Sequence, residues 1–163
     1  MIVKIKILPN GEGLPIPKKA TQYSACVDLY AAIEETITIN CGETKLIPCG
    51  FSIEVPIGYE AQVRPRSGLA LKNNITVLNS PGTIDADYRG EVAVILHNAS
   101  AEGNTTTASG THIIGAKTIV VHRGDRIAQM TIKKVEDFEF EVVSELSSTD
   151  RGTGGFGSTG VKN

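Results

Sequence analysis

The chain has 163 residues, of which 40% are hydrophobic and 21% are charged, and its formal net charge is −2. This length suits one domain with a core of its own, and the balance of apolar and charged residues excludes a disordered chain. No run of basic residues forms the stripe that stable nucleic-acid binding requires, and no apolar run approaches the roughly 20 residues of a membrane helix.

The N-terminal segment indicates a strand and not an export signal. Residues 1–8 alternate apolar and basic side chains, and Pro9 follows them. A secretory signal peptide would place a long apolar stretch behind a charged end. We therefore expect a cytoplasmic protein whose cysteines stay reduced, with a Cys41–Cys49 bridge across a hairpin as the alternative.

Short runs of β-branched residues recur along the chain between turn signals. Period-two alternation and 17 glycines favour an all-β sandwich or barrel. Because aromatic residues make up only 5% of the chain, Val, Ile and Leu must fill the core. After the first strand, further strands are expected at 37–39, 45–47, 51–55, 59–63, 91–96, 118–121, 127–132 and 138–143.

One short helix interrupts the strands. Ser67 is expected to cap a helix over residues 68–72, with Lys72 near its negative end. Asn73 and Asn74 suit a left-handed end of the helix. Because such a helix is too short to be stable alone, we expect it to present functional groups.

Two segments are rich in small and polar residues. Residues 99–117 separate two expected strands, and we interpret them as a surface loop. Residues 147–163 form a glycine-rich tail. We therefore divide the chain into a domain over residues 1–146 and a flexible C-terminal lid over residues 147–163.

The first candidate site lies at residues 64–70, where the helix begins. Arg66 and Ser67 would place a guanidinium, a hydroxyl and free backbone N–H groups together, which is a ready anion site. The alternative is a surface turn with a solvated arginine.

The second candidate is the acidic segment 79–90. Asp85 follows the pair Thr83-Ile84, so we expect its carboxylate to be partly enclosed. An enclosed carboxylate beside a bound phosphate could order a water molecule for attack. The alternative is a solvated hairpin loop.

Two polar residues interrupt expected strands. Gln129 lies within the apolar part of 122–130, and a buried amide needs partners, of which a backbone group of a neighbouring strand is one. Asp28 stands between apolar neighbours in 25–30, and an inward carboxylate is costly unless it is paired. For Asp28 we expect pairing with an arginine.

The tail segment 151–160 contains a G-x-G-x-x-G pattern, but no helix can follow it, which excludes a dinucleotide-binding fold. Its glycines allow close approach to phosphates, Arg151 adds charge, and Phe156 can stack on a base. The alternative to such a lid is a disordered tail.

In this order and spacing, the motifs at 66–68, 82–90, 123–129 and 151–160, together with 25–29, resemble those of the trimeric dUTPase family. The resemblance extends from about residue 25 to residue 160. It implies a jelly-roll-like β-barrel or sandwich of the β-clip type. It also implies a homotrimer whose three sites each draw on all three protomers.

By this resemblance, the activity is Mg²⁺-dependent hydrolysis of dUTP to dUMP and pyrophosphate, which lowers dUTP and supplies dUMP for dTTP synthesis. Asp85 would be the general base that orients water toward the α-phosphorus. Magnesium would be bound by the substrate phosphates, with Asp28 contacting it through water. The triphosphate would be held by Arg66, Ser67, Gly68 and Gln129.

The same resemblance assigns the remaining site residues. The uracil slot would be formed by Asn79 and by the backbone around Gly82, Thr83, Ile84 and Ala93. Tyr88 would lie under the sugar, where a 2′-hydroxyl collides with its ring. In the tail, which would come from a neighbouring protomer, Phe156 would cover the base, and the phosphates would be reached by Arg151, Gly157, Ser158 and Thr159.

Two positions depart from the family pattern: Cys26 stands where glycine is usual, and residues 99–117 are longer than the usual connection. Two other functions stay open. A deoxycytidine triphosphate deaminase shares the fold, although 66–68 and Asp85 favour pyrophosphate release. A non-catalytic nucleotide-binding jelly roll is the second alternative.

Overall fold

The structure is a computed structural model, and it describes residues 1–100, 103–107, 110–114 and 118–158. The strands are β1 (Lys4–Ile7), β2 (Val27–Tyr30), β3 (Ile37–Ile39), β4 (Thr44–Pro48), β5 (Phe51–Glu54), β6 (Tyr59–Arg64), β7 (Ile75–Val77), β8 (Gly82–Ile84), β9 (Ala93–Asn98), β10 (Gly103–Thr107), β11 (Gly110–Ile114), β12 (Ile119–Val121) and β13 (Arg126–Lys134). The helix α1 spans Ser67–Asn73, and a 3₁₀ turn, η1, spans Pro9–Gly11.

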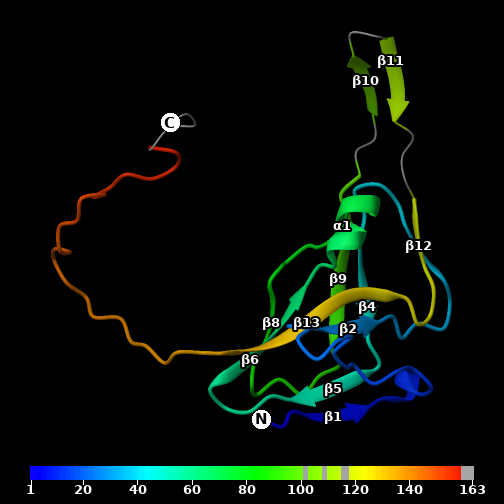
Figure 1. Cartoon of the computed structure of the whole chain (residues 1–163), viewed down its shortest axis with the longest axis horizontal. Helices are drawn as coiled ribbons and strands as arrows, with labels where there is room; N and C mark the ends of the chain where they lie inside the picture. Colours follow the sequence, from blue (N-terminus) through cyan, green and yellow to red (C-terminus); the bar gives the residue numbers. More distant parts are fainter. Residues whose placement is uncertain (101–102, 108–109, 115–117, 159–163) are drawn as a thin grey trace.

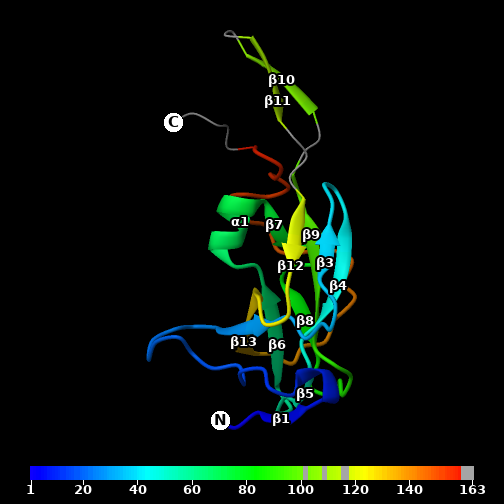
Figure 2. The same ribbon diagram turned by 90° about the vertical axis from the view of Figure 1, so that its right-hand side faces the viewer.

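Two antiparallel sheets enclose the core. One has the strand order β2-β13-β6-β8 and the other β4-β9-β7, while β1–β5, β3–β12 and β10–β11 form two-stranded ribbons. The helix α1 lies beside β7, and the β1–β5 ribbon lies at the opposite end of the body (Figures 1 and 2). The expected all-β fold with one short α-helix is confirmed.

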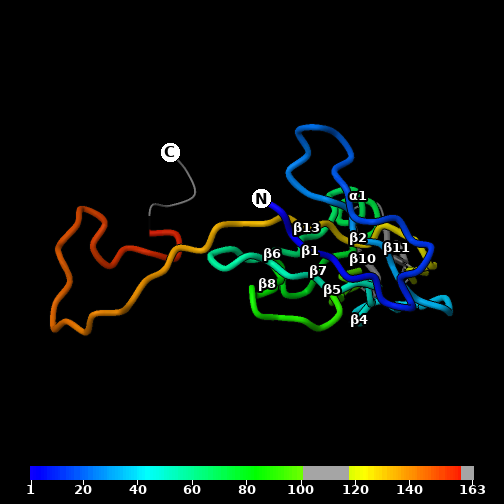
Figure 3. Tube along the Cα trace, turned by 90° about the horizontal axis from the view of Figure 1, so that it is seen from below, coloured from blue at the N-terminus to red at the C-terminus, as the bar shows by residue number. Residues whose placement is uncertain are grey.

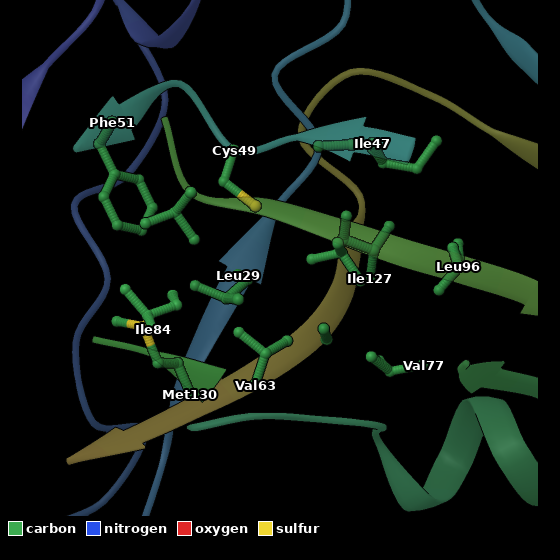
Figure 4. Close-up of a cluster of buried hydrophobic side chains, with 14 of the residues drawn as sticks. Leu29, Ile47, Cys49, Phe51, Val63, Val77, Ile84, Leu96, Ile127 and Met130 are labelled. Carbon is green, nitrogen blue, oxygen red and sulfur yellow. The ribbon is translucent and has the colours of Figure 1, made fainter. Parts of the chain in front are cut away.

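The core is built from side chains that both sheets turn inward (Figure 4). Along β9, Val94 and Leu96 are buried whereas Ala93 and Ile95 are half-buried, which is the period-two alternation of a strand with one buried face. Phe51 is the one aromatic side chain among the buried residues of the described ranges, as the low aromatic content predicts. Core residues labelled in Figure 4 include Leu29, Ile47, Val63, Ile84, Ile127 and Met130.

The helix differs from its prediction at one end. Arg66 is at the N-cap position and Ser67 is the first helical residue, and no side chain caps the helix. The prediction that Ser67 is the cap was therefore wrong. The C-terminal end is as expected, because Asn74 has a left-handed conformation with φ of 55°.

Two other segments also differ from prediction. Within 99–117, residues 103–107 and 110–114 pair as the hairpin β10–β11, which projects from the body, so these parts are not a plain loop (Figure 1). Positions 101–102, 108–109 and 115–117 lie outside the described residues. The expected strand at 138–143 is absent. Val135 N still donates to the Gly58 carbonyl oxygen at 2.9 Å, but the chain beyond it runs away from the body and pairs with no strand of the described residues (Figures 1 and 3).

Within the described residues, no helix has the length and apolar character needed to cross a membrane. Cys26, Cys41 and Cys49 are all free thiols.

Candidate functional site

Six of the expected site residues lie around one pocket of about 520 Å³. This is within the range of roughly 300–1,000 Å³ that is typical of small-molecule sites. The pocket lies between the segment that follows β7 and the outer faces of β4 and β9. Its lining residues are Leu46, Pro48, Asn79, Thr83, Ile84, Asp85, Tyr88, Glu91, Val92, Ala93 and Ile95.

Asp85 reaches this pocket because of the alternation along β8. Gly82 and Ile84 point into the protein, so Thr83 and Asp85 point outward. Asp85 is exposed in the single chain, whereas the sequence led us to expect a partly enclosed carboxylate. Its carboxylate forms no hydrogen bond or ion pair with any of the described residues. It is free to bind a ligand or a water molecule.

Asn79 lies against the start of β8. A Cβ atom on Gly82 would come within 3.0 Å of Asn79 Nδ2, so glycine is what allows the amide to lie over the strand. The main chain before Asn79 is tied to β9, because Leu78 N donates to Ile95 O at 2.9 Å. The amide is therefore held at the wall of the pocket.

Tyr88 is held by Gly90 and Glu91. Its hydroxyl donates to the Glu91 carbonyl oxygen at 3.1 Å, and 46% of the residue is exposed. Its ring lies on Gly90, where a Cβ atom would come within 2.3 Å of the hydroxyl oxygen. One face of the ring is thus supported by main chain, and its other parts remain open to a ligand.

A second set of expected residues lies around the start of β13. Asp28 Oδ1 is 3.1 Å from Arg66 Nε, and Asp28 Oδ2 is 3.2 Å from Arg126 Nη1. Arg66 Nη1 also donates to the Arg126 carbonyl oxygen at 2.9 Å. Asp28 therefore pairs with arginine, as the sequence predicts, and it orients the Arg66 guanidinium.

Gln129 completes this set. It lies opposite Asp28 on β2 and opposite Arg64 on β6, and its Nε2 donates to the Pro65 carbonyl oxygen at 2.9 Å. The expected contact with a neighbouring backbone group is thus present. Asp28 and Gln129 line a pocket of about 370 Å³ that also includes Cys26.

Ser67 and Gly68 are exposed at the start of α1, and nothing lies within 4 Å of where a Cβ atom on Gly68 would be. Their backbone N–H groups belong to the first turn of the helix, which has no carbonyl partners within the helix. This end of α1 is therefore accessible to an anion.

The two sets of residues do not share a pocket. Neither Arg66 nor Gln129 lines the 520 Å³ pocket, and neither Asp85 nor Tyr88 lines the 370 Å³ pocket. Arg66 instead lines a third pocket, of about 330 Å³, between α1, β9 and β12. The expected site residues of a single chain thus form two separate groups, which we call the two half-sites.

The tail residues are not brought to either half-site. Phe156 is fully exposed, and Arg151 Nε bonds only within the tail, to the Gly154 carbonyl oxygen at 2.8 Å. The described part of the tail, residues 147–158, projects from the body (Figure 3), and Gly157 and Ser158 belong to it. Thr159 is outside the described residues.

No group of three or more His, Cys, Asp or Glu side chains that could hold a metal ion is found within the described ranges. Both carboxylate oxygens of Asp28 are engaged by arginines. This donor set does not form a protein cage for a metal. It fits a hydrated ion whose direct ligands come from elsewhere.

Two residues of the site were missed by the sequence reasoning. Arg126 holds Asp28 with its side chain and Arg66 with its carbonyl group, and Glu91 lines the larger pocket. The sequence carried one signal for both residues: Arg126 and Glu91 are charged and stand directly before an apolar run.

Comparisons with known proteins agree on one family. A family model described as dUTPase matches residues 12–110 and 111–160. A deoxyuridine 5'-triphosphate nucleotidohydrolase of Rickettsia felis is 53% identical over 159 residues, covering 98% of this chain and 97% of the relative. One of Anaplasma marginale is 48% identical, covering 98% of each chain.

Solved structures agree with these relatives. The dUTPase of Staphylococcus bacteriophage 80alpha with dUPNHPP has a TM-score of 0.80 and 26% identity to this chain, and the match covers 98% of this chain and 99% of that one.

Proposed function

The chain belongs to the dUTPase family, and on that basis we propose that it hydrolyses dUTP to dUMP and pyrophosphate. The reaction lowers dUTP and supplies dUMP for dTTP synthesis. The observation that carries the proposal is the free carboxylate of Asp85 at the wall of a nucleoside-sized pocket that also contains Asn79 and Tyr88.

Asp85 acts as the general base. It accepts a proton from a water molecule whose oxygen attacks the α-phosphorus of dUTP. The bond between the α-phosphorus and the oxygen that bridges to the β-phosphorus breaks, and pyrophosphate leaves with that oxygen. A positioned base of this kind contributes about 10²–10⁴-fold to the rate.

The pocket selects the nucleoside by shape and hydrogen bonding. Asn79 and the backbone of Gly82, Thr83, Ile84 and Ala93 bind uracil in a slot that is too narrow for a 5-methyl group. A cytosine would leave buried polar groups unpaired, which is a costly mismatch. The ring of Tyr88 lies under the deoxyribose and collides with a 2′-hydroxyl.

The triphosphate is bound by the other half-site, which consists of Arg66, Ser67, Gly68 and Gln129. Asp28 holds the Arg66 guanidinium in place. Asp28 would hold a hydrated magnesium ion through water, and the phosphates would supply its direct ligands. When bound, the ion would neutralise part of the charge on the triphosphate.

The site is assembled from copies of the chain in a homotrimer. This proposal is supported by the separation of the two half-sites and by the length of the projecting tail. The tail, residues 147–163, closes over the nucleotide as a lid, with Phe156 over the base. Arg151, Gly157, Ser158 and Thr159 reach the phosphates.

The segment that precedes the lid is suited to docking on another copy. Acidic and apolar residues alternate over 137–142, and Phe138, Phe140 and Val142 are exposed. Strand β1 alternates lysine and isoleucine, and within the described residues it pairs only with β5. The free edge of β1 is therefore complementary to 137–142 in both charge and apolar pattern.

Pyrophosphate release with Mg²⁺ and each of dUTP, dTTP, dCTP and UTP tests the proposal. We expect release with dUTP and little with the other three. Ammonia from dCTP would identify a deaminase, and binding without turnover would identify a non-catalytic module; either result overturns the proposal.

Light scattering tests the trimer, and an active monomer would contradict the shared site. A cytoplasmic location and the absence of stable nucleic-acid binding stay predictions.

A further inference from the structure

Glu91 is a half-buried carboxylate that has no role in the reaction described above. Its Oε1 accepts two hydrogen bonds, from Asn10 Nδ2 at 2.7 Å and from Gly50 N at 2.8 Å. Asn10 belongs to η1, and Gly50 lies in the turn between β4 and β5. One side chain thus joins three segments that are far apart in the sequence.

The two donors are themselves fixed. Arg123 Nη1 donates to the Asn10 carbonyl oxygen at 2.8 Å, and Leu8 N donates to the Gly50 carbonyl oxygen at 2.9 Å. A Cβ atom on Gly11 would come within 2.0 Å of the Gly50 oxygen, so the two turns are in direct main-chain contact. The Glu91 carboxylate is therefore bound to a rigid support.

The main chain of Glu91 supports Tyr88. The Tyr88 hydroxyl donates to the Glu91 carbonyl oxygen at 3.1 Å, and the ring lies on Gly90. Two contacts fix the peptide unit that carries this carbonyl. Its N–H, that of Val92, donates to the Phe51 carbonyl oxygen at 2.8 Å. On the side that leads to Tyr88, the carboxylate of Glu91 adds the tie to η1 and to the β4–β5 turn.

We propose that Glu91 is a positioning residue that holds Tyr88 at the sugar end of the pocket and thereby sets the discrimination between deoxyribose and ribose. This inference rests on the proposed function, in which Tyr88 faces the sugar. Glu91 acts through Tyr88 and not on the reacting atoms. If the Tyr88 ring can move, the pocket has room for a 2′-hydroxyl.

The role requires an acceptor oxygen and not a negative charge. Glu91→Gln retains Oε1, which can still accept from Asn10 and Gly50, whereas Glu91→Ala removes it. Because both hydrogen bonds are lost, we expect Glu91→Ala to reduce the dUTP/UTP ratio of kcat/KM by about tenfold. Glu91→Gln should keep this ratio within about threefold of the wild type.

The experiment measures kcat/KM for dUTP and UTP in the full-length protein. Asn10→Ala removes one of the two donors, so it should lower the ratio in the same direction but less, and it tests the role even if Glu91→Ala does not fold. Glu34→Ala is the matched control, since Glu34 is an exposed glutamate away from these pockets and should leave the ratio unchanged.

A double-mutant cycle separates positioning from general destabilisation. In a Tyr88→Ala background, adding Glu91→Ala should change the ratio no further, because the sugar contact is already lost. The inference is overturned if Glu91→Ala slows dUTP and UTP equally, if its effect on the ratio adds to that of Tyr88→Ala, or if Asn10→Ala leaves the ratio at the wild-type value. A wild-type protein that fails to hydrolyse dUTP, or that hydrolyses UTP equally well, would overturn the proposed function itself.

Discussion

Replacing Asp85 by asparagine should separate chemistry from folding in this protein. The amide has the shape of the carboxylate, and the Asp85 side chain makes no hydrogen bond or ion pair with the described residues that the change could break. The free energy of unfolding should therefore change by less than about 0.5 kcal/mol. Turnover should fall by about 10²–10⁴-fold, because the amide cannot accept the proton from water. This loss corresponds to about 3–5 kcal/mol in the activation barrier.

The assay is pyrophosphate release at saturating dUTP with Mg²⁺, together with calorimetric binding of a non-hydrolysable dUTP analogue and thermal unfolding. Asp87→Asn is the matched control, because Asp87 is an exposed carboxylate in the same segment that does not line the pocket. It should leave turnover within about threefold of the wild type, as is usual for surface positions. The reasoning is refuted if Asp85→Asn keeps more than about a tenth of the turnover, or if Asp87→Asn loses as much.

Three further predictions follow from the tail and the core. Removal of the tail from Arg151 onward should leave a folded assembly, as seen by light scattering and circular dichroism, with turnover reduced by more than about tenfold; an unfolded product would exclude a lid. Burial raises the pKa of the Cys49 thiol to about 12 from its usual 9.0. The folded state therefore favours the neutral thiol, and the free energy of unfolding should fall by about 1.4 kcal/mol per pH unit between pH 9 and 12. In urea titrations this contribution should be present in full below pH 9 and absent in Cys49→Val, and an equal slope in both proteins would contradict it. Asn98 is fully buried and bonds Ile39 O and Ser100 N, so Asn98→Ala should cost about 3 kcal/mol in urea unfolding, and a loss below about 1 kcal/mol would show that these groups find other partners.

Local pattern was sufficient for most of the fold. Alternation along 51–55 and 59–63 predicted strands that became β5 and β6, because a strand with one buried face needs every second residue apolar. The same alternation at 138–143 predicted a strand that the single chain does not form. A strand also requires a partner edge, and alternation carries no information about whether one is available within the chain.

Motif chemistry was likewise readable from sequence, but the geometry was not. Asp85 and Tyr88 were assigned as a candidate base and a sugar contact from their motif, and they do line one pocket. The single chain leaves Asp85 exposed because Ile84 takes the inward position on β8. Neighbours along the chain could not show which residue would point outward beside the ligand.

The sequence by itself determined the all-β class and the chemical types of the candidate residues, since both depend on patterns within a few positions. Only the tertiary structure decided the partners of those residues. The contacts of Asp28 with Arg66 and Arg126, and of Glu91 with Asn10 and Gly50, join positions that are between 38 and 98 residues apart. Such pairs form because packing of the two sheets brings distant segments together, and no local spacing encodes them. The separation of the site into two half-sites has the same cause, because it follows from which strand edges and loops the sheets place side by side.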